Sequence, residues 1–169
     1  MKVILYMATT INGFIASEDH DTPWTDAEWD SYSSKVKETG NLIVGKITYD
    51  FMASDGSYEK LGNPTVVCLT KSVDNSSSNN HYFVKDFSSA IKLLTEQGFN
   101  HVLVGGGGFC DTAALESGLI DEIYIDVEPV LFGKGIPLFR ISDTNLKLQL
   151  IDHKQIGESG IQLHYRVIK

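Results

Sequence analysis

The stretch HVLVGGGGFCDTAAL, residues 101–115, places four consecutive glycines between an apolar run and a helix-like segment. Glycine loses more backbone freedom on folding than any other residue, so four in a row are costly to order. A strand, a tight glycine turn and a helix start expose free N–H groups at the positive end of the helix dipole, which favours an anion. We interpret Gly105, Gly106, Gly107 and Gly108 as an anion-binding turn. The alternative is that these glycines only allow a sharp turn and close helix packing.

Neither standard nucleotide-binding motif fits this turn. The Walker A pattern ends in Gly-Lys-Ser/Thr, and no such ending follows the glycines. In the dinucleotide pattern G-x-G-x-x-G, the third glycine would fall on Cys110 or on Asp111. The interpretation of this turn as an anion site therefore needs evidence from other parts of the sequence.

Apolar strand-like runs alternate with helical patterns, which predicts an α/β fold with a mainly parallel sheet and helices on both faces. The expected strands are 2–8, 41–45, 64–70, 81–84, 101–105 and 121–131. The expected helices are 25–40, 86–98 and 108–118, with 46–54 open as a short helix or a turn. Two alternating runs, 145–156 and 161–169, predict a C-terminal antiparallel hairpin, and the polar segment 72–80 predicts a solvent loop. We expect one domain spanning 1–169.

The helix expected at 25–40 has clear boundary signals. Thr25 and Glu28 have the spacing of a capping box at its start, and Gly40 suits its end.

Composition excludes several classes of function. The net charge is −8, whereas non-specific nucleic-acid binding depends on clustered lysine and arginine, so we expect no nucleic-acid partner. No apolar run approaches the roughly 20 residues of a membrane span, and the first residues lack a signal-peptide cleavage site. The only cysteines, Cys68 and Cys110, lie in or beside apolar segments, as is usual in a reducing compartment. The five histidines show no metal-ligand spacing, so we expect a cytoplasmic protein without a metal site.

A second cluster supports the anion-binding interpretation of the glycine turn. The segment IVGKITYDFM places Gly45, Lys46 and Thr48 directly after one strand. The segment LTKS places Thr70, Lys71 and Ser72 directly after another expected strand. Lysines and hydroxyls suit a phosphate, and the carboxyl ends of parallel strands gather at one edge of the sheet. The alternative is that both lysines are solvated surface residues.

These residues carry a resemblance to a known family. GKITYDFM is similar to a motif of dihydrofolate reductases, and VLVGGGGFCDTAAL resembles the turn that binds the NADPH pyrophosphate in that fold. GLIDEIYIDVEPVLFGKGIPLF, residues 118–139, resembles one branch more closely: the reductase domain of the bifunctional riboflavin-biosynthesis deaminase–reductase and its stand-alone relatives. TINGFIAS also resembles the first loop of that branch, so the resemblance spans nearly the whole chain. It implies a dihydrofolate reductase-like domain with three αβα layers.

The resemblance implies roles for individual residues in binding NADPH. It places Lys46 near the 2′-phosphate, Thr48 by the pyrophosphate, and Lys71 with Ser72 near the adenosine end. The turn from Gly105 to Gly108, with Phe109 beginning the helix, would hold the pyrophosphate through backbone N–H groups. The residues implied at the cofactor are Ala8, Ile15, Gly45, Lys46, Thr48, Thr70, Lys71, Ser72, Gly105, Gly106, Gly107, Gly108 and Phe109, with Ala8 and Ile15 sheltering the nicotinamide.

The chain departs from the riboflavin-pathway pattern at the substrate. Asn12 and Phe14 stand where that reductase usually has aspartate and lysine, and the usual glutamate before the glycine turn is missing. The chain also lacks a zinc deaminase pattern. The resemblance to dihydrofolate reductases also implies a catalytic acid near the start of the first helix. We consider Asp26 and Asp30, and we favour Asp30 because Asp26 suits the helix dipole.

Three functional hypotheses follow. The leading one is an NADPH-dependent reductase acting on a small heterocycle of the pterin or pyrimidine kind, with the riboflavin-pathway uracil reductase as a less favoured case. The second is a nucleotide-binding module of the same fold without turnover. The third is an apolar-cleft dimer without a cofactor, in which the glycines are structural. The resemblance also implies a homodimer.

Overall fold

The computed structural model describes residues 1–72 and 80–169, so most of the solvent loop expected at 72–80 lies outside the described residues. The elements in chain order are β1 (Lys2–Thr10), β2 (Phe14–Ala16), α1 (Asp26–Thr39), β3 (Asn41–Gly45), α2 (Lys46–Ser54), α3 (Ser57–Lys60), β4 (Thr65–Leu69), β5 (His81–Val84), α4 (Phe87–Glu96), β6 (His101–Val104), α5 (Gly108–Glu116), β7 (Glu122–Glu128), β8 (Ile136–Pro137), β9 (Lys147–Ile156) and β10 (Gly160–Ile168).

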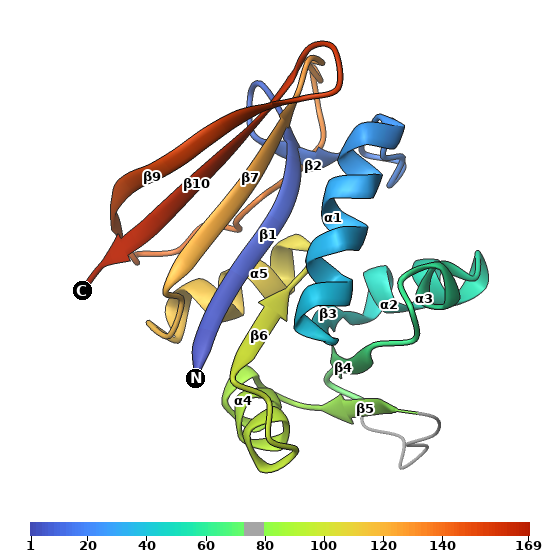
Figure 1. The fold of residues 1–169 in the computed structure, drawn as a ribbon, viewed down its shortest axis with the longest axis vertical. Coiled ribbons are helices and arrows are strands. Elements are labelled where there is room, and N and C mark those ends of the chain that lie inside the picture. The colour runs from blue at the N-terminus through green and yellow to red at the C-terminus, as the bar shows by residue number, and fades with distance from the viewer. Residues whose placement is uncertain (73–79) are drawn as a thin grey trace.

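The main sheet has the strand order β5-β4-β3-β6-β1-β7-β10-β9. The strands from β5 to β7 run parallel to one another, whereas β7 with β10 and β10 with β9 pair antiparallel. In Figure 1 the long strands β1, β7, β10 and β9 lie side by side, with the hairpin at the C-terminal edge. The mainly parallel sheet and the C-terminal hairpin predicted from the sequence are confirmed.

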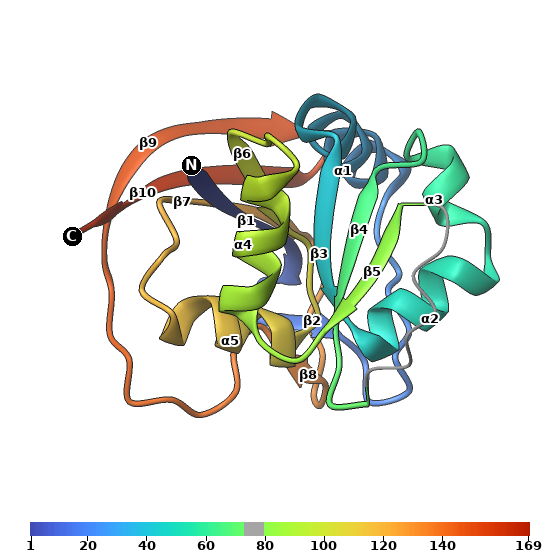
Figure 2. The same ribbon diagram turned by 90° about the horizontal axis from the view of Figure 1, so that it is seen from below.

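Helices cover both faces of the sheet (Figure 2). Alternate residues of the central strand β1 point to opposite faces, because side chains alternate along a strand. Ile4 and Tyr6 pack into a core with α1, α2 and α3, while Val3 and Leu5 pack into a core with α4 and α5. β1 is therefore buried on both sides, which is why its sequence reads as a continuous apolar run.

Local hydrogen bonds set the two predicted boundaries of α1. The Thr25 hydroxyl accepts a bond from the Glu28 N–H at 3.3 Å at the start of α1. Gly40 ends α1 at a φ of 70°, with its N–H bonded to the Val36 carbonyl at 2.8 Å. The region 46–54, which the sequence left open, is the helix α2.

The sequence did not predict α3 or the small sheet of β2 and β8. β2 and β8 pair antiparallel, Phe14 opposite Pro137, although they are far apart in the chain. A Cβ at Gly135 would stand 2.5 Å from the Ala16 carbonyl oxygen, so glycine allows this close approach. The pairing fixes Ile15 above the carboxyl ends of the central strands. Among the helices in the described ranges, none has the length and apolar character needed to cross a membrane.

Candidate active site

A cleft of about 1040 Å³ opens at the carboxyl ends of the parallel strands, where ligands of open α/β sheets bind. Its walls come from the ends of β1, β3, β4 and β6, from β2, and from the starts of α2 and α5. The sequence-predicted residues that line it are Ala8, Ile15, Gly45, Lys46, Thr48, Thr70, Lys71, Gly105, Gly106, Gly107, Gly108 and Phe109. The fold thus brings distant segments together around one cavity.

Ser72 and Asp30 lie outside this cleft. The Ser72 N–H donates to the Thr70 hydroxyl at 3.2 Å, and the same hydroxyl donates to the Ser72 carbonyl, so these residues order the chain after β4. Asp30 is exposed and lines a separate groove between α1 and the C-terminal hairpin. The structure therefore does not bring Asp30, the acid favoured from the sequence, to the cleft.

Contacts within the protein already require most of the glycines in the turn. A Cβ on Gly105 would stand 2.5 Å from the Tyr32 hydroxyl, and one on Gly108 would stand 2.8 Å from the Pro137 carbonyl oxygen. Gly106 has a φ of 99°, where other residues are strained, and its Cβ would lie 2.9 Å from the Met7 sulfur. Close packing therefore explains these positions without a ligand, and any function of the turn has to come from its backbone groups.

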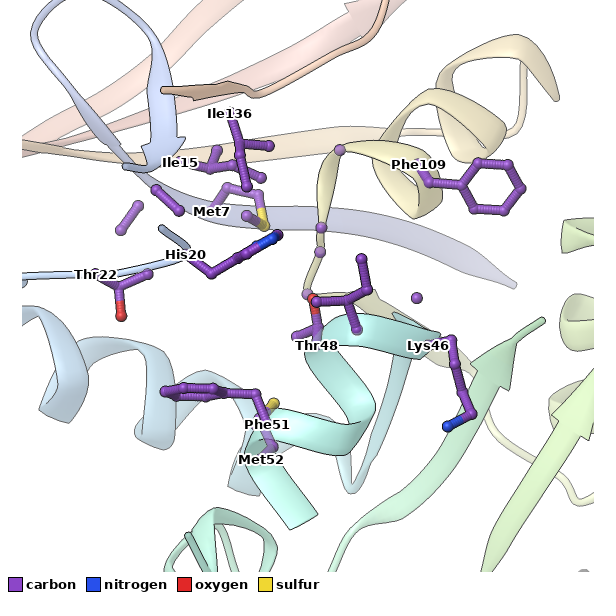
Figure 3. Close-up of a pocket in the computed structure, with 18 of the residues that line it drawn as sticks. Met7, Ile15, His20, Thr22, Lys46, Thr48, Phe51, Met52, Phe109 and Ile136 are labelled. Carbon is purple, nitrogen blue, oxygen red and sulfur yellow. The ribbon is translucent and has the colours of Figure 1, made fainter. Parts of the chain in front are cut away.

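The backbone of the turn suits an anion. The N–H groups of Gly106, Gly107 and Gly108 donate to no acceptor in the described part of the chain, and they precede or begin α5. Unpaired N–H groups at a helix N-terminus form an anion site together with the helix dipole. The Thr48 side chain lies beside the turn, with its oxygen 3.2 Å from where a Cβ on Gly107 would be (Figure 3). These groups fit the pyrophosphate of a dinucleotide.

One end of the cleft is basic. Lys46 and Phe109 lie at this end in Figure 3, and the parallel register of β3 and β4 brings Lys71 to the same end. The Lys46 Nζ is bonded to both carboxylate oxygens of Asp50 at 2.6 Å, and this pair raises the pKa of Lys46. The Arg140 guanidinium lies over the Phe109 ring, 5.6 Å from its centre. Lys46, Lys71 and Arg140 thus all line the cleft, and the charge of Lys46 is partly balanced by Asp50.

The opposite end of the cleft contains a buried acid, Glu28 in the first turn of α1. Only 4% of Glu28 is exposed. Burial, reinforced by the nearby carboxylates of Asp126 and Glu128, raises the pKa of Glu28 to about 8. Glu28 therefore holds its proton at neutral pH and can donate it to a ligand in the cleft.

Glu28 is free to line the cleft because another residue completes the cap of α1. In a capping box the glutamate side chain reaches back to the backbone N–H of the cap residue. Here the Thr25 N–H donates instead to the Glu128 carboxylate at 3.0 Å, and the Thr25 hydroxyl donates to its other oxygen at 3.2 Å. Glu128 comes from β7 and is 1% exposed. The cap predicted from the sequence forms through Thr25, but its acidic partner is Glu128.

Sequence reasoning missed Glu28 and Arg140 as functional residues. Glu28, Tyr32 and Val36 follow one another at intervals of four on the buried face of α1, so this spacing was the available signal for Glu28. No comparable signal marks Arg140, because it reaches the cleft through the irregular segment after β8.

The eight-stranded, mainly parallel sheet between two helical layers, with a glycine turn opening α5, is the dihydrofolate reductase-like fold. The chain belongs to the RibD C-terminal domain family, whose family model matches residues 1–162. The resemblance identified in the sequence is confirmed.

Relatives extend over nearly the whole chain. The uncharacterized protein YwjB of Bacillus subtilis is 32% identical over 97% of this chain and 97% of its own length. A putative riboflavin biosynthesis protein from Shewanella sp. PV-4 has the same fold, with a TM-score of 0.79, 23% identity and complete coverage of both chains. The Thermotoga maritima diaminohydroxyphosphoribosylaminopyrimidine deaminase/5-amino-6-(5-phosphoribosylamino)uracil reductase has a TM-score of 0.77 and 20% identity, covering 99% of this chain and 56% of that one.

Proposed function

We propose that this protein is an NADPH-dependent reductase of a small, planar, unphosphorylated heterocycle. The observation that carries the proposal is the polarity of the cleft. Its two ends differ in chemistry. One end has cations and turn N–H groups without an acceptor among the described residues, and the other has a buried acid whose raised pKa favours the protonated form. A reductase needs both a site for a phosphate-bearing cofactor and a proton donor for the reduced substrate.

The residues of the basic end would hold the cofactor. The turn N–H groups and Thr48 suit the pyrophosphate, and Lys46, Lys71 and Arg140 suit the 2′-phosphate that distinguishes NADPH from NADH. Ile15 provides an apolar wall for the nicotinamide. Bound NADPH supplies the hydride.

The lining of the other end favours a substrate without a phosphate. The described residues that line it include the carboxyls of Glu18, Glu28 and Asp55, and its one basic side chain is His20. Trp29 and Phe51 provide aromatic surface for a flat ring. The Thermotoga relative is named for a phosphoribosylamino substrate, whose phosphate would meet mostly acids here. We therefore infer a pyrimidine-like or pterin-like ring without a ribose phosphate.

Glu28 would complete the reduction. A reduced C=N or C=C bond takes up a hydride at one atom and a proton at the other, and the protonated Glu28 carboxyl can deliver that proton from the inner wall. After this transfer Glu28 is a carboxylate and would take up a proton from solvent when the product leaves, and its burial in the cleft favours this return to the neutral form.

NADPH oxidation followed at its absorbance maximum, over a panel of free and phosphoribosylated pyrimidines and pterins, tests this proposal. We expect turnover with an unphosphorylated ring, a loss of about 10²-fold or more in kcat for Glu28→Gln, and wild-type turnover for Asp30→Asn. NADPH binding without turnover on any panel member would favour the non-catalytic nucleotide-binding module. Failure of the folded protein to bind either cofactor would favour purely structural glycines.

The sheet edge supports the homodimer that the family resemblance implies. β9 is an edge strand that is exposed from Lys147 to Gln155, and it carries Leu148, Leu150 and Ile151 on its surface. Exposed edges of this length readily pair with another strand. We propose that two copies associate along β9, and the molar mass of wild type and of Leu150→Lys in sedimentation equilibrium tests this.

A further inference from the structure

A buried acid that the proposed reaction does not use lies behind the glycine turn. Asp111 in α5 is fully buried, and neither of its carboxyl oxygens has a hydrogen-bond partner among the described residues. Its Oδ2 lies 4.0 Å from where a Cβ on Gly106 would stand, so the carboxyl is directed at the turn. None of the ion pairs in the described ranges includes it.

Asp111 lies in the first turn of α5, where the helix dipole favours a negative charge, but its complete burial and the lack of a positive partner among the described residues disfavour its ionised form. The titratable groups that face it are the Tyr32 hydroxyl from α1 and the Cys110 thiol from its own helix. Both are acids whose pKa burial raises, so neither offers a positive charge. Met7 of β1 contributes an apolar contact with Gly106 on the same side of the turn. Burial without a partner accordingly raises the pKa of Asp111 well above its usual range.

The charge of this carboxyl matters because of what the other side of the turn binds. An ionised Asp111 would place a negative charge directly behind the N–H groups that are to hold a pyrophosphate. At such short range and in a water-poor environment, like charges repel strongly. A neutral carboxylic acid removes this repulsion and leaves the dipole of α5 available to the ligand.

We propose that Asp111 is a proton-linked component of the dinucleotide site, so that the turn binds a pyrophosphate only while Asp111 carries its proton. The inference rests on the proposed function in that NADPH is the ligand of this turn. Asp111 would not contact the ligand. Its protonation state would determine whether the turn carries a repelling negative charge behind the bound pyrophosphate. Cofactor affinity then falls with rising pH, and cofactor binding favours proton uptake by Asp111.

The test is the dissociation constant of NADPH between pH 7 and 9.5, measured by fluorescence titration for wild type, Asp111→Asn and Glu28→Gln. Asparagine keeps the shape of the neutral acid but cannot ionise. We expect Kd for wild type and Glu28→Gln to rise by up to about tenfold per pH unit above the Asp111 pKa, and Kd for Asp111→Asn to change less than about twofold over the range. The Glu28→Gln variant removes the acid at the other end of the cleft, so a dependence that this variant keeps and Asp111→Asn loses belongs to Asp111.

Calorimetry on the wild-type protein alone, in buffers of different ionisation enthalpy, provides a second readout. Net proton uptake on NADPH binding supports the proposal even if Asp111→Asn fails to fold. The same pH dependence of Kd in Asp111→Asn as in wild type, or no dependence and no proton uptake in wild type, overturns the inference and leaves the reductase proposal standing. Absence of NADPH and NADH binding to folded wild type at every pH overturns the proposed function itself.

Discussion

Replacing Glu28 by glutamine should remove a pH-dependent loss of stability that is built into the cleft. Glu28 has a folded-state pKa of about 8 against 4.5 for the free side chain. Since the folded pKa is the higher one, ionisation favours unfolding: stability is fully present below about pH 4.5 and is lost as the pH rises towards 8. One pKa unit corresponds to about 1.4 kcal/mol. From pH 5 to pH 8 the wild type should therefore lose about 3.5 kcal/mol relative to Glu28→Gln, because unfolded Glu28 is already mostly ionised at pH 5 and folded Glu28 is half ionised at pH 8.

Urea unfolding followed by tryptophan fluorescence at pH 5, 6.5 and 8 measures this difference as a shift in midpoint at constant slope. Asp30→Asn is the matched control, because Asp30 is on the same helix but is exposed outside the cleft. It should follow the wild-type pH dependence. Equal curves for wild type and Glu28→Gln, within about 1 kcal/mol at every pH, would refute the assignment of Glu28 as a protonated acid.

Other changes test neighbouring parts of the site. Asp126→Asn removes a negative charge that raises the pKa of Glu28, so the pH midpoint of the Glu28-dependent stability should move below 8. An unmoved midpoint would mean that burial and Glu128 set it without Asp126. Gly105→Ala should destabilise the fold by about 1–3 kcal/mol through overpacking. The control Gly133→Ala should change the unfolding midpoint little, because a Cβ at Gly133 has open space around it. Equal unfolding midpoints for the two variants would contradict the packing explanation of the turn. Lys46→Ala should weaken NADPH binding about tenfold and NADH binding little, as measured by fluorescence titration, and equal losses for both cofactors would place the 2′-phosphate elsewhere.

The main sheet, the longer helices and most residues at one end of the cleft could be predicted from the sequence. The alternation of apolar runs and helical patterns predicted the mainly parallel sheet and the hairpin, because burial on both faces leaves a visible pattern. The segments after β3, β4 and β6 could be assigned to one cleft, because the carboxyl ends of parallel strands meet at one edge of a sheet. Local signals therefore sufficed to place Lys46, Thr48 and the glycine turn at the cleft that they line in the structure.

Which acid of α1 lines the cleft depends on tertiary packing. Asp30 and Glu28 are two residues apart on α1, so the rotation of the helix against the sheet determines which of them is buried. That rotation depends on packing of Tyr32 and Val36 against β1 and β3, and the role of Glu28 depends on Glu128, which comes from β7 and takes over the cap. Contacts between residues about a hundred positions apart leave no periodic signal in the sequence. The charge chemistry of the cleft is therefore a property of the folded chain.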